Sequence, residues 1–396
     1  MPATNTDTSY GSVTRTFHWL IALAILTLLP LGIVTNDLPE ATGDEQALKA
    51  GLFQLHKTLG VLVFFVASAR ILWALTQTRP VPLHPSRRAE GFLAAIIHWL
   101  IYISLVVVPL TGWIGHAATT GFAPIWWPFG QGLPFVPKSE GLADVLSGLH
   151  SLFGYLLGVC VLLHIAGALK HQFVDRDATL LRMWSGRPAG RGRHERSIAP
   201  PLTATAIYVA ALGIGATVGL FAPVEEGTAA PTLADVASEW QVTDGTLGLT
   251  VTQFGSDVSG RFDDWTAAIT FDPDIRDAVA GAVDAAISIP SLTLGSVTEQ
   301  ALGEDYLSAA AFATATYDGQ ILHANDGYSS YGFLTVRDRE AALDFPLDLA
   351  VNGDTATLTA TVPLDRRDFG VGPADQDGTV AFPVTIDIAL TATRGD

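Results

Sequence analysis

Long apolar stretches dominate the first half of the chain. Four of them contain no charged residue, and the one at 53–75 carries Lys57 and Arg70 only near its ends. A helix needs about 20 mainly apolar residues to cross the hydrocarbon core of a bilayer. The pattern therefore predicts five membrane-spanning helices, at residues 16–36, 53–75, 92–114, 145–169 and 197–224.

The hydrophobic period changes to two residues in the second half. Alternating segments at 246–252, 343–351, 356–362 and 384–390 predict strands with one wet face, and Gly and Asp turns separate them. Residues 297–308 are expected to form one short helix. About 160 residues of strands joined in this way indicate an antiparallel sandwich or a closed barrel. Alternation alone does not distinguish a ligand cavity from a filled core.

These patterns divide the chain into three parts. Residues 1–190 form an all-α transmembrane four-helix bundle, and residues 191–230 contain a basic loop, a fifth transmembrane helix and a small-residue linker at 225–234. Residues 231–396 form an all-β antiparallel domain with one short helix. The predicted fold is thus a helical membrane bundle followed by a β-barrel.

The charges divide the chain at the same place. The net charge of −17 sums a first half (1–200) at +4 and a second half (201–396) at −21 that contains no Lys. A chain without a basic domain does not suit nucleic-acid binding. The loops at 76–91 and 172–200 are rich in Arg, whereas the loop at 37–52 is mainly acidic. The positive-inside rule then places the N-terminus in the cytoplasm and the acidic domain outside.

Four histidines mark the ends of the predicted spans. His18 begins the first span, His56 the second, and His150 and His164 lie at the two ends of the fourth. Fourteen residues separate His150 from His164, which places them on one face of a helix and about 21 Å apart along its axis. With the predicted topology, His18 lies level with His164 at the inner side and His56 level with His150 at the outer side.

Two stacked histidine pairs are what two b-type haems require. Bis-histidine ligation leaves no open position on the iron, which favours electron transfer over oxygen binding. The competing interpretations are four interfacial polar caps and a zinc site, but nothing supplies the further ligands that zinc needs. The only cysteine, Cys160, excludes an intramolecular disulfide, an iron–sulfur cluster and covalent c-type haem.

The first half also resembles the bacterial di-haem cytochrome b561 family. The resemblance covers about residues 10–185 and rests on R-T-F-H-W (15–19), L-H-K-T-L-G (55–60), R-I-L-W (70–73), H-W-L-I-Y (98–102), L-H-S-L-F-G-Y (149–155), H-I-A-G-A-L-K-H (164–171) and D-A-T-L-L-R-M (177–183). It implies a four-helix bundle with two haem b groups, linked to the quinone pool. The positions that match the family's axial ligands are His18, His56, His150 and His164.

Other polar groups have a functional and a structural interpretation. Arg15, Lys57 and Arg70 lie near the predicted haem levels and either pair a haem propionate or are snorkelling charges. His171, one heptad beyond His164, either hydrogen-bonds a quinone or is an interfacial histidine. His98 is expected to be structural and without a partner. Four further histidines are expected to lie in loops or at the surface: His84, His116, His194 and His323.

The second half resembles the YceI-like family of periplasmic lipocalin-like barrels. The resemblance covers about residues 235–395 and rests on V-S-G-R-F-D-D-W (258–265), I-T-F-D-P (269–273), Y-L-S-A-A-A-F (306–312), Y-G-F-L-T-V-R (331–337) and R-R-D-F-G-V-G (366–372). It implies a barrel that holds an isoprenoid chain, a polyprenol or a quinone.

We therefore expect an oxidoreductase of the bacterial inner membrane with a periplasmic C-terminal domain. Two haems would carry electrons between a periplasmic donor, which by resemblance includes superoxide, and ubiquinone or another isoprenoid quinone. One alternative is a membrane-anchored lipid-binding protein whose barrel carries an isoprenoid. The other is a haem b electron-wire subunit that serves an external dehydrogenase. Membrane lipid is an expected partner in each case.

Overall fold

The computed structural model describes residues 2–39, 43–119, 123–190, 197–221, 232–234, 236–324, 327–374 and 379–395. The expected basic residues Arg191, Arg193, His194 and Arg196, and most of the expected linker at 225–234, lie outside these ranges. The chain divides into two compact units, one with the long helices and one with the strands.

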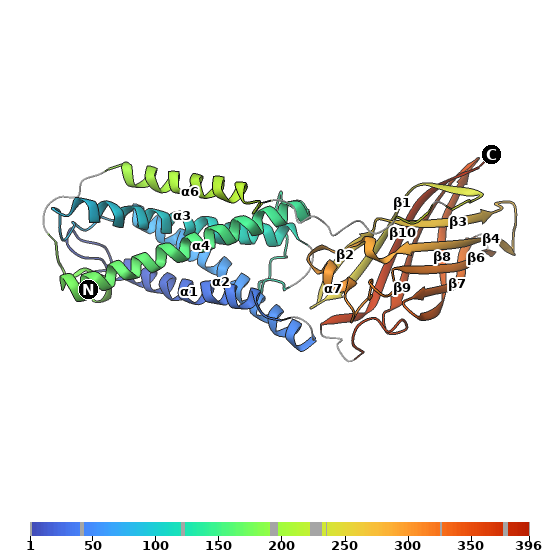
Figure 1. Ribbon diagram of the computed structural model, residues 1–396, viewed down its shortest axis with the longest axis horizontal. Helices are drawn as coiled ribbons and strands as arrows, with labels where there is room; N and C mark the ends of the chain where they lie inside the picture. Colours follow the sequence, from blue (N-terminus) through green and yellow to red (C-terminus); the bar gives the residue numbers. More distant parts are fainter. Residues whose placement is uncertain are drawn as a thin grey trace. The chain divides into compact units, whose positions relative to one another are not determined.

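The helical unit contains five helices long and apolar enough to cross a membrane (Figure 1). They are α1 (Ser12–Asn36), α2 (Gly43–Leu75), α3 (Arg88–Ala118), α4 (Glu140–Lys170) and α6 (Ala199–Thr217). A π-helical turn, η1 (His171–Asp175), continues α4, and the short α5 (Thr179–Trp184) follows. The five expected spans are confirmed, and α2, α3 and α4 extend beyond the uncharged runs into polar flanks.

Apolar side chains fill the space between the helices and also cover their outer surface. One buried cluster joins α1 to α4 through Ile21, Ala67, Leu105 and Leu157, and Cys160 is buried in a second cluster between α3, α4 and α6. Large apolar side chains such as Leu72 and Leu162 are nevertheless two-thirds exposed. Outward apolar side chains on such helices fit contact with lipid, so the helical unit is a membrane bundle.

Helix α6 is held to the bundle by a buried hydroxyl pair. Tyr208 on α6 hydrogen-bonds Ser104 on α3, and its hydroxyl also donates to the carbonyl oxygen of Leu100 at 3.4 Å. Ala204, fully buried, lies on the same side of α6. A small residue and a hydroxyl at one interface are typical of packed membrane helices.

The second unit is one antiparallel sheet of ten strands (Figure 1). The strands are β1 (Trp240–Gln253), β2 (Ser256–Phe262), β3 (Trp265–Phe271), β4 (Val279–Ser288), β5 (Leu292–Thr293), β6 (Thr314–Ala324), β7 (Gly327–Val336), β8 (Arg339–Asn352), β9 (Thr355–Asp365) and β10 (Val380–Arg394). Their order is β3-β4-β6-β7-β8-β9-β10-β1-β2-β5. The expected strands are confirmed, and the short helix α7 (Thr298–Leu302) occupies part of the segment expected to be helical.

Two glycines shape this sheet. Gly353 has a φ of +62° in the two-residue turn that joins β8 to β9, where Asn352 pairs with Thr355. In β1, a Cβ on Gly245 would lie 2.8 Å from a ring carbon of Trp265 on β3. The glycine therefore lets the edge strand β3 fold over β1, so the sheet curls toward a barrel.

Candidate functional site

The structure brings both predicted histidine pairs together in the helical unit. The ring centroids of His18 on α1 and His164 on α4 are 6.1 Å apart, with the rings inclined at 64°. Those of His56 on α2 and His150 on α4 are also 6.1 Å apart, at 83°. Because α4 is one unbroken helix from Glu140 to Lys170, the two pairs lie about 21 Å apart along it.

His56 and His150 lie against two glycines. A Cβ on Gly32 of α1 would lie 2.8 Å from Cε1 of His56, and a Cβ on Gly112 of α3 would lie 2.8 Å from Nδ1 of His150. Only a residue without a side chain leaves room for these imidazoles. The sequence analysis missed these two contacts with candidate ligands, and four helices build this level of the bundle.

A backbone hydrogen bond orients His150. Its Nδ1 lies 2.9 Å from the carbonyl oxygen of Val108, which can only accept, so the proton is on Nδ1. The lone pair is then on Nε2, the tautomer that a metal-ligating imidazole needs. Histidine ligands are commonly held in this way by a hydrogen bond from the other ring nitrogen.

The donor set fits a b haem at each pair. Two nitrogen–metal bonds of about 2 Å, plus about 1 Å from each nitrogen to its ring centre, bring two ligating imidazoles to roughly 6 Å between centroids. Both pairs are at 6.1 Å. The glycine cradle and the surrounding apolar helices suit a flat apolar macrocycle better than a small hydrated ion.

A third imidazole that the sequence analysis did not anticipate lies beside the His18–His164 pair. The ring centroid of His98 on α3 is 5.1 Å from that of His164, and its Nδ1 lies 2.7 Å from the carbonyl oxygen of Ala94. We expected His98 to be structural and without a partner, because neither its spacing nor its topology pairs it with another histidine. Helix packing places it beside the candidate ligand.

The three predicted propionate partners have different surroundings. A guanidinium nitrogen of Arg70 lies 3.5 Å from Nδ1 of His18, in the His18–His164 pair. Arg15, one turn before His18, donates to the carbonyl oxygen of Trp184 at 2.9 Å. Lys57, next to His56, places its Nζ 3.4 Å from Nδ1 of His116. Their contact with a propionate stays a prediction.

Two histidines expected at the surface are buried. His116 is 8% exposed at the end of α3, where its Nε2 lies 2.8 Å from Oε1 of Gln131. His323 is 6% exposed on β6 and packs edge-on against Tyr328. The surface expectation was wrong for both, because a lone histidine near an element's end carries no periodic signal of burial.

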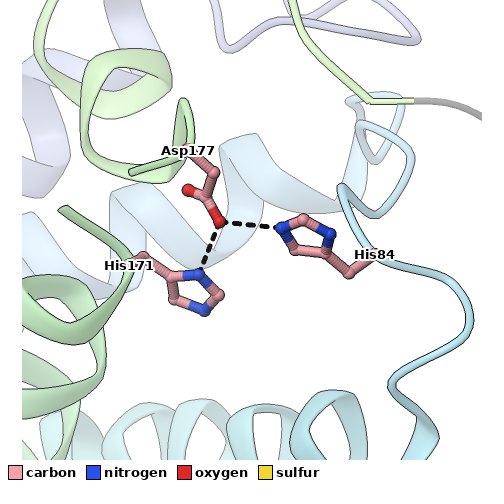
Figure 2. A group of neighbouring side chains, drawn as sticks. All are labelled: His84, His171 and Asp177. Atoms are coloured by element: carbon pink, nitrogen blue, oxygen red, sulfur yellow. Dashed lines mark hydrogen bonds and ion pairs between the residues drawn. The ribbon is translucent and has the colours of Figure 1, made fainter. Parts of the chain in front are cut away.

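His171, the predicted quinone contact, belongs to a polar cluster beyond the end of α4 (Figure 2). Its Nδ1 lies 2.7 Å from Oδ2 of Asp177, and Nε2 of His84 lies 2.9 Å from the same oxygen. Burial alone would raise the pKa of Asp177, but hydrogen bonds from Thr179, His84 and His171 hold it far below its usual value. Sequence analysis placed His84 in a loop and did not connect it with His171.

The strand unit encloses an apolar cavity of about 310 Å³. Its lining comes from almost every strand and includes Leu249, Phe262, Ala315, Phe345 and Ile386. A few polar residues also reach it, among them Gln253, which is 3% exposed. The filled-core alternative is therefore wrong, and the cavity suits an apolar chain rather than a charged ligand.

Two family models match different parts of the chain. Residues 9–186 match the family model of prokaryotic cytochrome b561, and residues 239–392 match that of the YceI-like domain. Cytochrome b561 homolog 2 of Escherichia coli (strain K12) is 29% identical over 188 residues, which span 46% of this chain and 95% of that protein. The probable superoxide oxidase CybB of Yersinia pestis is 28% identical over 176 residues, 44% of this chain and 94% of that protein.

Solved structures match the second half. BcnA of Burkholderia cenocepacia has a TM-score of 0.35 and 28% identity, over 38% of this chain and 96% of BcnA. A Campylobacter jejuni YceI protein has a TM-score of 0.31 and 17% identity, over 44% of this chain and 97% of that protein.

Proposed function

We propose that this chain, which joins a cytochrome b561 region (residues 9–186) to a YceI-like domain (residues 239–392), is a membrane oxidoreductase that moves electrons through two b haems between a periplasmic donor and the quinone pool. Membrane electron transfer with b haem is the property of the cytochrome b561 family. The number of haems, the donor and the quinone are our proposal.

The proposal rests on two histidine pairs that have the same spacing. Each pair holds two imidazoles at 6.1 Å, and the two pairs stand at opposite ends of α4. His18 and His164 would hold one haem, and His56 and His150 the other. A bound haem b supplies a reversible one-electron centre. With two histidines as ligands, each iron would have no open position, so this chain's residues favour electron transfer over oxygen binding.

The protein's own contribution is to fix the ligands in a dry interior. His150 is positioned by the hydrogen bond from its Nδ1 to Val108 and by its contact with Gly112. His56 is positioned by its contact with Gly32. Arg70 places positive charge beside His18, where it would offset the negative charge of a propionate. Arg15 and Lys57 are proposed to serve the same purpose.

The orientation follows from the distribution of cations. Arg79, Arg87 and Arg88 lie before or at the start of α3, and Arg176, Arg182 and Arg187 follow α4. We place this end of the bundle, with the His18–His164 pair, at the cytoplasmic side of a bacterial inner membrane. The His56–His150 pair and the C-terminal domain then face the periplasm.

Superoxide is the donor we propose, because one relative of the helical half is named a probable superoxide oxidase. Two superoxide ions would be oxidised to dioxygen, and the two electrons with two protons would convert one ubiquinone into ubiquinol. Lys57 and Lys138 are cations at the proposed periplasmic end, where they would attract an anion. At the other end, His171 is the proposed contact for the quinone.

The barrel is proposed to carry an isoprenoid chain. Its cavity of about 310 Å³ is lined almost wholly by apolar side chains, which would contact the tail of a quinone or a polyprenol. This cavity also supports a second candidate function, a membrane-anchored isoprenoid carrier whose helices are mainly an anchor. Both functions predict lipid in extracts of the purified chain, so they are separated by the electron-transfer assay below, in which a carrier should show no activity above background.

The test of the oxidoreductase is superoxide-driven reduction of ubiquinone by the purified chain in detergent or liposomes. The haem-loaded protein should reduce ubiquinone well above a haem-free preparation, and His56→Ala or His150→Ala should bring the rate down to that background. A rate no higher than that of the haem-free preparation contradicts superoxide as the donor. Activity retained in both variants contradicts the ligand assignment.

A further inference from the structure

Two segments that are distant in sequence meet at the cluster in Figure 2. His84 lies in the loop before α3, His171 begins the π-helical turn η1, and Asp177 lies between η1 and α5. One coordinating atom from each, Nε2 of His84, Nδ1 of His171 and Oδ2 of Asp177, lies within 4.8 Å of the other two. The imidazole rings are parallel to within 4°, with centroids 6.2 Å apart.

The Asp177 carboxylate is held in one orientation. Its Oδ1 accepts a hydrogen bond from the backbone N–H of Thr179 at 2.8 Å, and its own backbone N–H donates to the carbonyl oxygen of His171 at 3.1 Å. This leaves Oδ2 directed at both imidazoles. The side chain is 10% exposed, so the geometry is set by the protein rather than by solvent.

His171 has the second contact that a metal-ligating histidine usually makes. While its Nδ1 faces Asp177, its Nε2 lies 3.2 Å from Oε1 of Glu90 at the start of α3. A carboxylate on the far nitrogen fixes the ring and raises the basicity of the ligating nitrogen. A further carboxylate oxygen, Oδ2 of Asp175, lies 3.2 Å from Nδ1 of His171.

The charges around the cluster leave an excess of one negative charge. Three carboxylates, Glu90, Asp175 and Asp177, face two cations, Arg87 and Lys170. Both cations form ion pairs with Glu90 and Asp175, whereas the ion pairs of Asp177 among the described residues are with His84 and His171. A cation at Asp177 would offset this negative charge.

We propose that His84, His171 and Asp177 bind a divalent transition-metal ion of the Zn²⁺ class. Two imidazoles with a carboxylate suit Zn²⁺ and its first-row neighbours, whereas Mg²⁺ and Ca²⁺ prefer oxygen ligands alone. The bound ion ties the loop before α3 to the end of α4, seven residues beyond His164. It occupies Nδ1 of His171, while Nε2 on the opposite side of the ring keeps its contact with Glu90.

The test is Zn²⁺ binding to the haem-loaded full chain after chelator treatment, by isothermal titration and by X-ray absorption at the zinc edge. We expect one Zn²⁺ per chain with two imidazole ligands. His84→Gln should leave one imidazole and weaken binding at least 10-fold, and Asp177→Asn should weaken it similarly. His84 lies in a loop and is 35% exposed, so its replacement should leave the fold intact, which the haem spectrum checks.

Lys170→Gln is the matched control within the same network. Its ammonium lies 2.9 Å from Oδ2 of Asp175 and 2.7 Å from Oε1 of Glu90, so its removal should tighten Zn²⁺ binding. Unchanged Zn²⁺ affinity in both His84→Gln and Asp177→Asn would overturn the proposal, as would the absence of imidazole from the zinc spectrum. The readout is metal binding, so it is independent of whether superoxide and quinone are the substrates.

Discussion

Replacing Gly112 with alanine tests how the bundle positions a haem ligand. The added Cβ would lie 2.8 Å from Nδ1 and 2.9 Å from Cε1 of His150. Ordinary contacts between such atoms are about 3.5 Å or more, so the ring must move by roughly 0.7 Å. Because Val108 lies one turn before Gly112 on the same helix, this movement stretches the 2.9 Å hydrogen bond from His150 to about 3.6 Å, beyond hydrogen-bond range.

The free-energy cost of the substitution follows from the displaced ring and the lost hydrogen bond. Overpacking a well-filled interior costs about 1–3 kcal/mol, and losing a hydrogen bond costs about 1 kcal/mol. A total of about 2–4 kcal/mol corresponds to at least a roughly 30-fold loss of haem affinity at the His56–His150 pair. The pair formed by His18 and His164 lies at the other end of α4 and should keep its haem.

The assay is the haem content per chain of purified Gly112→Ala, together with the rate at which haem passes to excess apomyoglobin. We expect one rapidly lost haem and one retained haem. Gly213→Ala on the exposed side of α6, away from both histidine pairs, is the matched control, since its added Cβ meets no atom within 4 Å and should change nothing. If Gly112→Ala keeps both haems as firmly as the wild type, the glycine does not set the position of His150.

Three further predictions concern the rest of the chain. Tyr208→Phe removes the buried hydroxyl contacts of α6 and should lower the bundle's stability in detergent unfolding by about 0.6–2 kcal/mol. Ala315→Leu projects into the barrel cavity and should reduce co-purifying lipid measured by mass spectrometry, whereas Thr316→Leu on the exposed face should not. Hydrogen bonding from Arg367 lowers the pKa of Asp365 from 3.8 to about 2. The stability it contributes is therefore present above pH 4 and lost as the pH falls toward 2, and Asp365→Asn should flatten the stability of the barrel across that window.

The histidine pairs could be predicted because a membrane helix is regular. The rise of about 1.5 Å per residue places His150 and His164 at two levels on one face, and the order of the spans then assigns His56 and His18 to those levels. This reasoning does not require knowing how the neighbouring helices are rotated about their own axes. It holds because α4 is unbroken over the fourteen residues involved.

Contacts that depend on helix rotation could not be predicted in the same way. Gly32 and Gly112 are two of many glycines in the spans, and only packing shows that imidazoles lie against them. His98 comes to lie beside His164 because α3 turns that face toward α4. One signal could have identified Gly32 and Gly112. Each is a glycine that lies opposite a candidate ligand, on a neighbouring helix and at the same depth.

The cluster of His84, His171 and Asp177 lay beyond sequence reasoning for a different reason. His84 and Asp177 are separated by 93 residues and lie in irregular segments, where no period relates their side chains. In the barrel, alternation did predict strands at 343–351 and 356–362. The cavity depends instead on the volume left between opposite walls, which alternation does not report.

Haem stoichiometry tests the central claim most directly. Pyridine haemochrome analysis of the purified chain should give two b haems per polypeptide, and about one each in His150→Ala and His164→Ala, with different reduced-minus-oxidised spectra for the two variants. A wild-type chain with fewer than two haems, or the full wild-type haem content in both variants, would contradict the account.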